Sequence, residues 1–160
     1  MVRILALGAM TLALSGCGGS DDAGDDDGGG GPVQIASGPL TGKVGGASWT
    51  LATAQTDAFL SDEQSFWVDA YAQPLSSCND FGSGNSLILN VPRTVGTHRL
   101  SLSLNATFVV EGAETDNLVA TQGAIRVDEV TAAVVRGGVT MTFDADNSVS
   151  GEFEAVVCAE

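Results

Sequence analysis

The sequence predicts an all-β protein: an antiparallel β-sandwich, or a small closed barrel, of about eight strands. Small residues, Val, Leu and Thr dominate the composition, which includes 21 glycines in 160 residues and only 6% aromatic residues. After residue 40, no window shows the apolar spacing of an amphipathic helix. Apolar residues instead recur at every second position, in segments that short polar turns separate. The length suits one domain with room for a core.

Four segments in the first part of the domain show this alternation. They are ASWTLAT (47–53), SFWVDAYA (65–72), SLILNVP (86–92) and HRLSLSLNATFVV (98–110). The last has the cleanest pattern, with Leu100, Leu102 and Leu104 on one face and serines between them, so it predicts one continuous strand. Pro92 ends the third segment or marks a sheet edge.

Three further strands are predicted at the C-terminal end, in GAIRVDEV (123–130), VVRGGVTMTFDA (134–145) and SVSGEFEAVV (148–157). The Gly137-Gly138 pair lies inside the second of these and predicts a bulge or a tight bend. The residues expected to point into the core are Ile125, Val127, Val135, Val139, Met141, Phe143, Val149, Phe153, Ala155 and Val157.

Residues 1–16, MVRILALGAMTLALSG, have the layout of a secretory signal. Arg3 is the single basic residue, and the apolar stretch from Ile4 to Leu14 is too short to span a bilayer. The segment ends in Leu14-Ser15-Gly16-Cys17, which resembles the lipobox of bacterial lipoproteins. The resemblance implies that Cys17 is lipidated, that the leader is cut before it, and that Cys17 holds the protein on a membrane. Position 18 is Gly rather than Asp. By the same resemblance, this implies that the protein is anchored in the outer membrane and faces either the periplasm or the cell exterior.

A low-complexity segment follows, so we expect residues 17–37 to form a lipidated cysteine and a flexible tether. Five aspartates lie within residues 21–27, and glycines surround them. Glycine makes a chain flexible, and like charges extend it. Such a segment cannot bury apolar surface, so we expect it to be disordered. The remaining residues, 38–160, form the single predicted β-rich domain.

The formal net charge of −14 limits the partners. So acidic a surface repels phosphate backbones, which argues against nucleic-acid binding. It also argues against docking onto anionic lipid head groups. Solubility is the simplest role for the charge.

Two cysteines remain once Cys17 is assigned to lipid. An even pair in an exported domain predicts a disulfide between Cys78 and Cys158, and two free thiols are the alternative. The last 35 residues also resemble the C-terminal part of small β-rich domains of uncharacterised bacterial lipoproteins. The segment Val149-Ser150-Gly151-Glu152-Phe153, which ends near Cys158, carries that resemblance, and it implies no activity.

The sequence offers little chemistry for catalysis. His98 is the only histidine, no metal ligands cluster near it in the sequence, and no G-x-S-x-G motif is present. Asp128-Glu129 and the Asp144/Asp146 pair lie at strand ends or turns, where carboxylates are usually solvated. We therefore predict no enzyme activity, no metal and no cofactor.

The most informative group for binding is Trp67, Asp69 and Tyr71. Alternation places all three on the face of their strand opposite Phe66 and Val68. Two aromatic rings and a carboxylate in a row can bind a sugar or anchor a protein partner. The alternative is a strand buried on both faces, in which Trp67 and Tyr71 are core residues.

The sequence therefore predicts a lipid-anchored protein of the cell envelope. Its domain would be a non-enzymatic structural or interaction module, with an envelope protein or a glycan as its partner. The alternative is a module that binds a carbohydrate or another small ligand.

Overall fold

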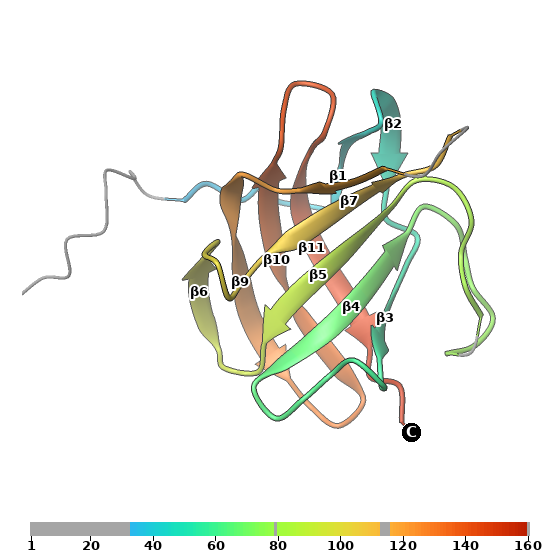
Figure 1. The fold of residues 1–160 in the computed structure, drawn as a ribbon. Coiled ribbons are helices and arrows are strands. Elements are labelled where there is room, and N and C mark those ends of the chain that lie inside the picture. The colour runs from blue at the N-terminus through green and yellow to red at the C-terminus, as the bar shows by residue number, and fades with distance from the viewer. Residues whose placement is uncertain (1–32, 79, 113–115, 160) are drawn as a thin grey trace, which may run out of the picture. The chain divides into compact units, whose positions relative to one another are not determined.

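The computed structural model describes residues 33–78, 80–112 and 116–159, and this part of the chain is all-β, as predicted (Figure 1). Eleven strands and no helix are found there. The strands are β1 (Thr41–Val44), β2 (Ala47–Thr50), β3 (Thr53–Asp57), β4 (Ser65–Tyr71), β5 (Ser86–Pro92), β6 (Gly96–Arg99), β7 (Ala106–Val110), β8 (Asp116–Val119), β9 (Gln122–Val130), β10 (Val134–Thr142) and β11 (Ser148–Val156).

The strands form one curled, open sheet, so the expected sandwich or closed barrel is not confirmed. The strand order is β6-β9-β10-β11-β3-β4-β5-β7-β8, and the β1–β2 hairpin attaches to β11. All neighbours pair antiparallel except β11 and β3, which are parallel. The curl brings β4, β5 and β7 across β9, β10 and β11 (Figure 1). The core lies between them, and its largest fully buried side chains include Phe108, Leu87, Leu89, Ile125 and Met141.

Strand β11 joins the two halves of the sheet. It pairs with β10 along one edge over its whole length. Its other edge pairs with β1 from Ser148 to Ser150 and with β3 at Val156. Between these two partners the segment before β1 lies against it, because the amide of Leu40 donates to the Glu152 carbonyl at 2.9 Å.

This close approach requires glycine at position 151. Gly151 has φ +148°, which L side chains rarely adopt. A Cβ there would lie 2.5 Å from the Pro39 carbonyl oxygen and 2.6 Å from Cα of Leu40. Only a residue without a side chain therefore lets residues 39 and 40 contact β11.

Two asparagines hold the turn of the β1–β2 hairpin onto both halves of the sheet. Asn147 is 4% exposed and accepts the amide of Gly45 at 2.8 Å. From the opposite side, the Asn85 side chain donates to the Val44 carbonyl, and the Asn85 carbonyl accepts the Trp49 indole N–H at 2.9 Å. The hairpin thus buries Val44 and Trp49 while its polar turn groups stay hydrogen-bonded.

The three C-terminal strands form as predicted. Their core-facing residues are buried or half-buried, and the register of β9 and β10 shifts between Arg136 and Gly137, which is the expected bulge. The outward positions Glu152 and Glu154 are exposed.

The prediction of one strand over residues 98–110 is wrong. Strand β6 ends at Arg99, where the Leu100 amide still bonds to β9 through the Gly123 carbonyl, and β7 begins only at Ala106, beside β5. The chain crosses from one half of the sheet to the other in a turn that the Ser101 amide and Leu104 carbonyl close at 2.9 Å. Leu102 lies at the tip of this turn and is fully exposed.

The segment 47–53 divides in the same way. Its middle residues pass from the segment before β1 to β4. The Leu51 amide donates to the Leu40 carbonyl, and the Ala52 amide donates to the Tyr71 carbonyl. These two divisions, together with the unanticipated short strands β1 and β8, explain why eleven strands replace the expected eight or so.

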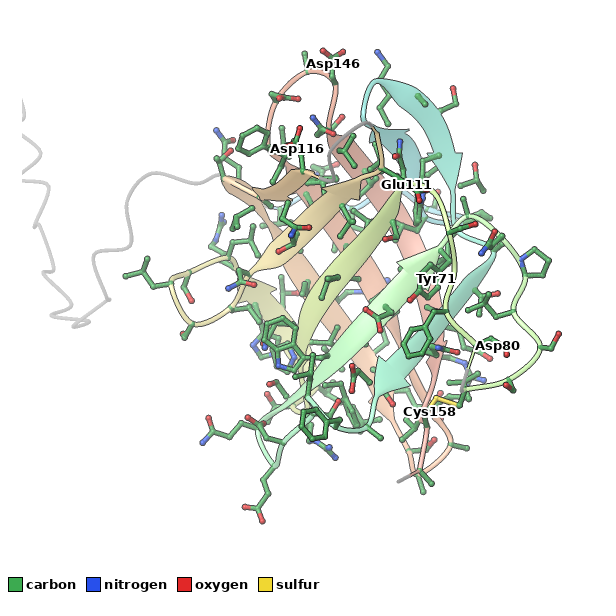
Figure 2. All side chains as sticks on the ribbon, turned by 45° about the vertical axis from the view of Figure 1, so that its right-hand side comes forward. Tyr71, Asp80, Glu111, Asp116, Asp146 and Cys158 are labelled. Atoms are coloured by element: carbon green, nitrogen blue, oxygen red, sulfur yellow. A yellow bond between two sulfur atoms is a disulfide. The ribbon has the colours of Figure 1, made fainter. Side chains whose placement is uncertain are left out.

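The predicted disulfide between Cys78 and Cys158 is present, with 5.7 Å between the two Cα atoms (Figure 2). It ties the β4–β5 loop to the end of the chain after β11. The Cys158 amide also donates to the Thr56 hydroxyl at 2.9 Å, so the C-terminus is attached to β3 as well.

We expect Gly151→Ala to lower the free energy of unfolding by more than about 2 kcal/mol, since both the backbone conformation and the contact with Pro39 oppose a Cβ. Urea denaturation followed by circular dichroism measures this. Gly46→Ala is the control: Gly46 has φ +75°, but only open space surrounds its Cβ position out to Asp146 at 4.0 Å. We expect Gly46→Ala to lower the free energy of unfolding by about 1 kcal/mol. If Gly151→Ala lowers it by no more than this, the close approach of residues 39 and 40 does not require glycine at position 151.

We expect a Cys78→Ser/Cys158→Ser double variant to be less stable than the oxidised protein, because the bond closes a loop of 80 residues. Loop-closure entropy sets an upper value of roughly 4.5 kcal/mol. Thermal unfolding with and without a reductant measures the effect. Reductant should lower the melting temperature of the unsubstituted protein and leave that of the double variant unchanged. An equal decrease in both proteins would contradict a stabilising Cys78–Cys158 disulfide.

Candidate functional site

Trp67, Asp69 and Tyr71 lie on the outer face of β4, as the alternation predicts. The residues between them, Val68 and Ala70, are fully buried in the core. Cross-strand pairing places Asp69 beside Gln55 of β3, and places Trp67 between Asp57 of β3 and Asn90 of β5. The three side chains therefore follow one line along the front of the sheet.

Tyr71 does not present an open ring. It is 7% exposed, and a Cβ on Gly82 would lie 2.1 Å from its ring, so the Gly82 backbone packs directly on it. Burial raises the pKa of the Tyr71 phenol, the charge of Asp69 raises it further, and a backbone hydrogen bond from Gly82 opposes both effects. In this structure Tyr71 thus supports the loop that covers it, which is the buried alternative considered for this residue.

The covering segment is the β4–β5 loop. The Leu75 amide donates to the Thr53 hydroxyl at 3.0 Å, and the Gln55 side chain donates to the Asp80 carbonyl at 3.0 Å. The Asp80 carboxylate in turn accepts two backbone amides of the loop, each at 3.0 Å. Figure 2 shows Asp80 and Tyr71 on the same side of the domain, with the disulfide of Cys158 nearby.

Asp69 is the most perturbed acid of the described residues. Burial raises its pKa from 3.8 to about 6, and the charge of Asp57 adds to the shift. Asp57 stays fixed nearby because its carboxylate accepts the amides of Phe59 and Leu60 at 2.8 and 2.9 Å. A carboxyl of this kind can exchange protons close to neutral pH, but no basic side chain pairs with it among the interactions found in the described residues.

Trp67 is the member of the group that stays partly open. Its side chain is half-buried, and its backbone amide donates to the Ser61 hydroxyl at 3.0 Å. The three residues therefore do not form one continuous exposed platform. A ligand at this face would meet Trp67 first.

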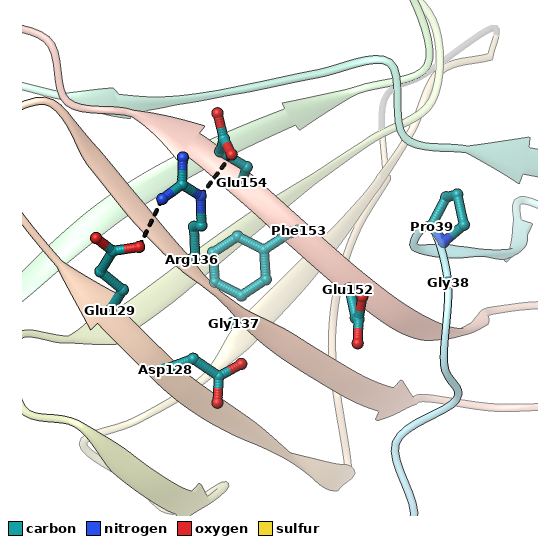
Figure 3. Close-up of a pocket in the computed structure, with 9 residues that line it drawn as sticks. All are labelled: Gly38, Pro39, Asp128, Glu129, Arg136, Gly137, Glu152, Phe153 and Glu154. Atoms are coloured by element: carbon teal, nitrogen blue, oxygen red, sulfur yellow. Dashed lines mark hydrogen bonds and ion pairs between the residues drawn. The ribbon is translucent and has the colours of Figure 1, made fainter.

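A second surface feature is a shallow groove of about 710 Å³ on the opposite side, over β9, β10 and β11. Figure 3 shows Arg136 bonded to Glu129 on one side and to Glu154, at 2.6 Å, on the other. Arg126 bonds Asp128 at 2.8 Å and lies 3.8 Å from Glu152. These pairs are solvated, so they contribute little to stability. Each of the two guanidinium groups thus has two carboxylate partners. Because four carboxylates meet two guanidinium groups, this face keeps an excess of negative charge.

The other predicted residues lie in separate places. Cys17 and the leader before it fall outside the described residues. A ring nitrogen of His98, Nε2, lies 2.9 Å from the Thr94 carbonyl at the start of β6. The portions at 33–78, 80–112 and 116–159 contain no cluster of three or more His, Cys, Asp or Glu residues arranged for a metal ion, and no helix able to cross a membrane.

Comparison with known proteins adds no relative: no protein family, no curated protein and no solved structure matches this chain.

We expect Asp69→Asn to stabilise the protein near neutral pH. A carboxyl whose pKa is raised by folding costs stability as the pH rises from about 4 through about 6, because the folded state then must bury a charge that the unfolded state solvates. The gain at about pH 7 is on the order of 1 kcal/mol after allowance for partial exposure, and it vanishes near pH 4. Thermal melts across this pH range test it.

The exposed Asp116 on β8 provides the matched control, since Asp116→Asn should leave the pH dependence of the melting temperature unchanged. A gain from Asp69→Asn that is the same at both ends of the pH range, or a loss at neutral pH, would show that burial does not strain this carboxylate.

Proposed function

We propose that the chain is a lipid-anchored protein of the cell envelope. One observation carries the proposal: Leu14-Ser15-Gly16-Cys17 follows an 11-residue apolar stretch and precedes a Gly/Asp-rich tether. Acyl chains on Cys17 would hold the protein on the membrane, and several chains bind far more firmly than one. The disulfide of the domain supports an oxidising compartment outside the cytoplasm. The outer membrane, facing the periplasm or the exterior, is the proposed location.

The domain on this tether acts as a non-enzymatic structural or interaction module. The chemistry of the described acids supports this role. Asp57 and Asp80 accept backbone amides that fix loops, and the four carboxylates over β9–β11 contact two arginines. Such contacts stabilise a surface. Negative charge directs the module toward envelope proteins or glycans and away from nucleic acid.

A second candidate, a module that binds a carbohydrate or small ligand, is favoured by one feature. The half-buried Trp67 lies beside Asn90, which lines a polar hollow at the end of the front strands. An indole next to amide and hydroxyl groups is a common arrangement for binding sugars.

We expect Cys17→Ser to move the protein from the membrane fraction to the soluble fraction, because a serine hydroxyl does not take the place of the thiolate in lipid attachment. Cell fractionation and the intact mass of the purified protein give the two readouts. Ser20→Ala, three residues further on in the tether, is the control and should remain with the membranes. A Cys17→Ser protein that still sediments with membranes after a salt wash contradicts the anchor.

A further inference from the structure

The carboxylate of Asp69 lies on the outer face of β4 without an opposite charge from its neighbours. Its cross-strand neighbours are Gln55 of β3 and Ile88 of β5, and neither is charged. Burial raises the pKa of Asp69 to about 6, and the like charge of Asp57 adds to the shift. Once ionised, Asp69 is therefore a partly buried charge in surroundings that favour a cation.

The other ionisable groups around Asp69 do not supply a positive charge either. Tyr71, two residues further along β4, is a phenol whose pKa the charge of Asp69 raises. Asp80 belongs to the loop at this end of the strand, and its carboxylate accepts two backbone amides of that loop, each at 3.0 Å. The described groups that face Asp69 from β3, from β4 and from the β4–β5 loop are thus acidic or neutral.

Trp67 adds an aromatic surface to the same face of β4. It lies two residues before Asp69, and it is half-buried. Its cross-strand neighbours are Asp57 of β3 and Asn90 of β5. Directly opposite residues on one face of an antiparallel pair have Cβ atoms about 4.5–5.5 Å apart. One small ligand can therefore meet an indole, two carboxylates and an amide at this place.

The carboxylate of Asp57 is held in a fixed position at the end of β3. Its Oδ1 accepts the amides of Phe59 and Leu60 at 2.8 and 2.9 Å. Because both bonds go to Oδ1, Oδ2 is the oxygen that a ligand can meet. Asp57 thus contributes a second, oriented negative charge beside Trp67.

The charge of the whole chain favours the same kind of ligand. A formal net charge of −14 attracts cations to the protein and repels anions from it. A sugar acid or a phosphate would in addition meet the like charges of Asp57 and Asp69 at this face. A ligand with a positive charge would instead compensate them.

We propose that this face of β4 binds an amino sugar, a small ligand that joins a protonated amine to a sugar ring. The amine pairs with Asp69 and Asp57, because hydrogen bonds between ionised groups are stronger than neutral ones. The apolar face of the ring lies on the Trp67 indole, which also attracts the cation. The Asn90 amide hydrogen-bonds the ring hydroxyl groups. The proposal rests on the second candidate function, carbohydrate binding, and does not depend on the lipid anchor.

Titration of the full-length protein with glucosamine, followed by NMR of the indole N–H signals, tests the proposal. Trp49 and Trp67 are the only tryptophans, and Trp49 is 4% exposed with its indole N–H bonded to the Asn85 carbonyl. We expect a saturable shift of the Trp67 signal alone, with a dissociation constant on the order of 1 mM at about pH 7. Glucose, which has a hydroxyl in place of the amine, should bind at least about tenfold more weakly.

The binding of glucosamine should weaken as the pH falls. With a pKa of about 6, Asp69 is mostly ionised near pH 7 and mostly protonated near pH 5. The dissociation constant for glucosamine should therefore rise about tenfold between these two values, whereas that for glucose should not change.

Matched variants separate a contact with Asp69 from the general charge of the protein. Asp69→Asn should weaken glucosamine binding at least about tenfold and remove its pH dependence. Asp116→Asn, at an exposed position on β8, should change neither. Trp67→Phe identifies the Trp67 signal by its loss.

Failure of this proposal can be told apart from failure of the candidate function. No shift of the Trp67 signal with either sugar would contradict both. Equal binding of glucose and glucosamine, or an equal effect of the two asparagine variants, would overturn the amine contact while leaving a carbohydrate-binding module supported.

Discussion

The fold depends on strand β11, because it is the only connection between the two halves of the sheet along the described strand order. One edge is fully paired with β10, and the other is divided between β1, residues 39 and 40, and β3. That division needs a glycine at position 151, where backbone meets backbone. Most of a small domain's stability comes from its single core. A link between the two layers that enclose the core therefore affects the stability of the whole domain.

The same division produces the surfaces described above. Pairing of β11 with β3 at one point only lets the sheet curl without closing. Strand β6 pairs with β9 on one side and ends the described strand order on the other, and the polar hollow lies between β6 and the ends of β4 and β5. Beyond β11, Cys158 bonds to the β4–β5 loop, whose Gly82 packs on Tyr71. On the other side, β9–β11 present paired charges to solvent. Four carboxylates and two guanidinium groups meet there, so this face keeps an excess of negative charge.

Sequence reasoning succeeded where one pattern determines both the strand and its face. In β9–β11, buried and exposed positions alternate around a Gly-Gly bulge, and each strand pairs with the next in the chain. It failed at residues 98–110, because alternation of Leu and Ser shows which side chains share a face but not whether a partner strand is present. It placed Trp67, Asp69 and Tyr71 on the correct face of β4. The cover over Tyr71 was not predictable even with the disulfide foreseen, since it depends on the Gly82 backbone packing directly on the ring.

Native-state hydrogen exchange across β11 and its neighbours tests the central role of this strand most directly. Buried amides that exchange only on global unfolding share one opening free energy, whereas independent units show separate values. We predict a single value for the protected amides of β3, β4, β10 and β11, because β11 couples both halves of the sheet. A lower opening free energy for β3–β5 than for β9–β11 would show that the front half opens alone, which would contradict this account.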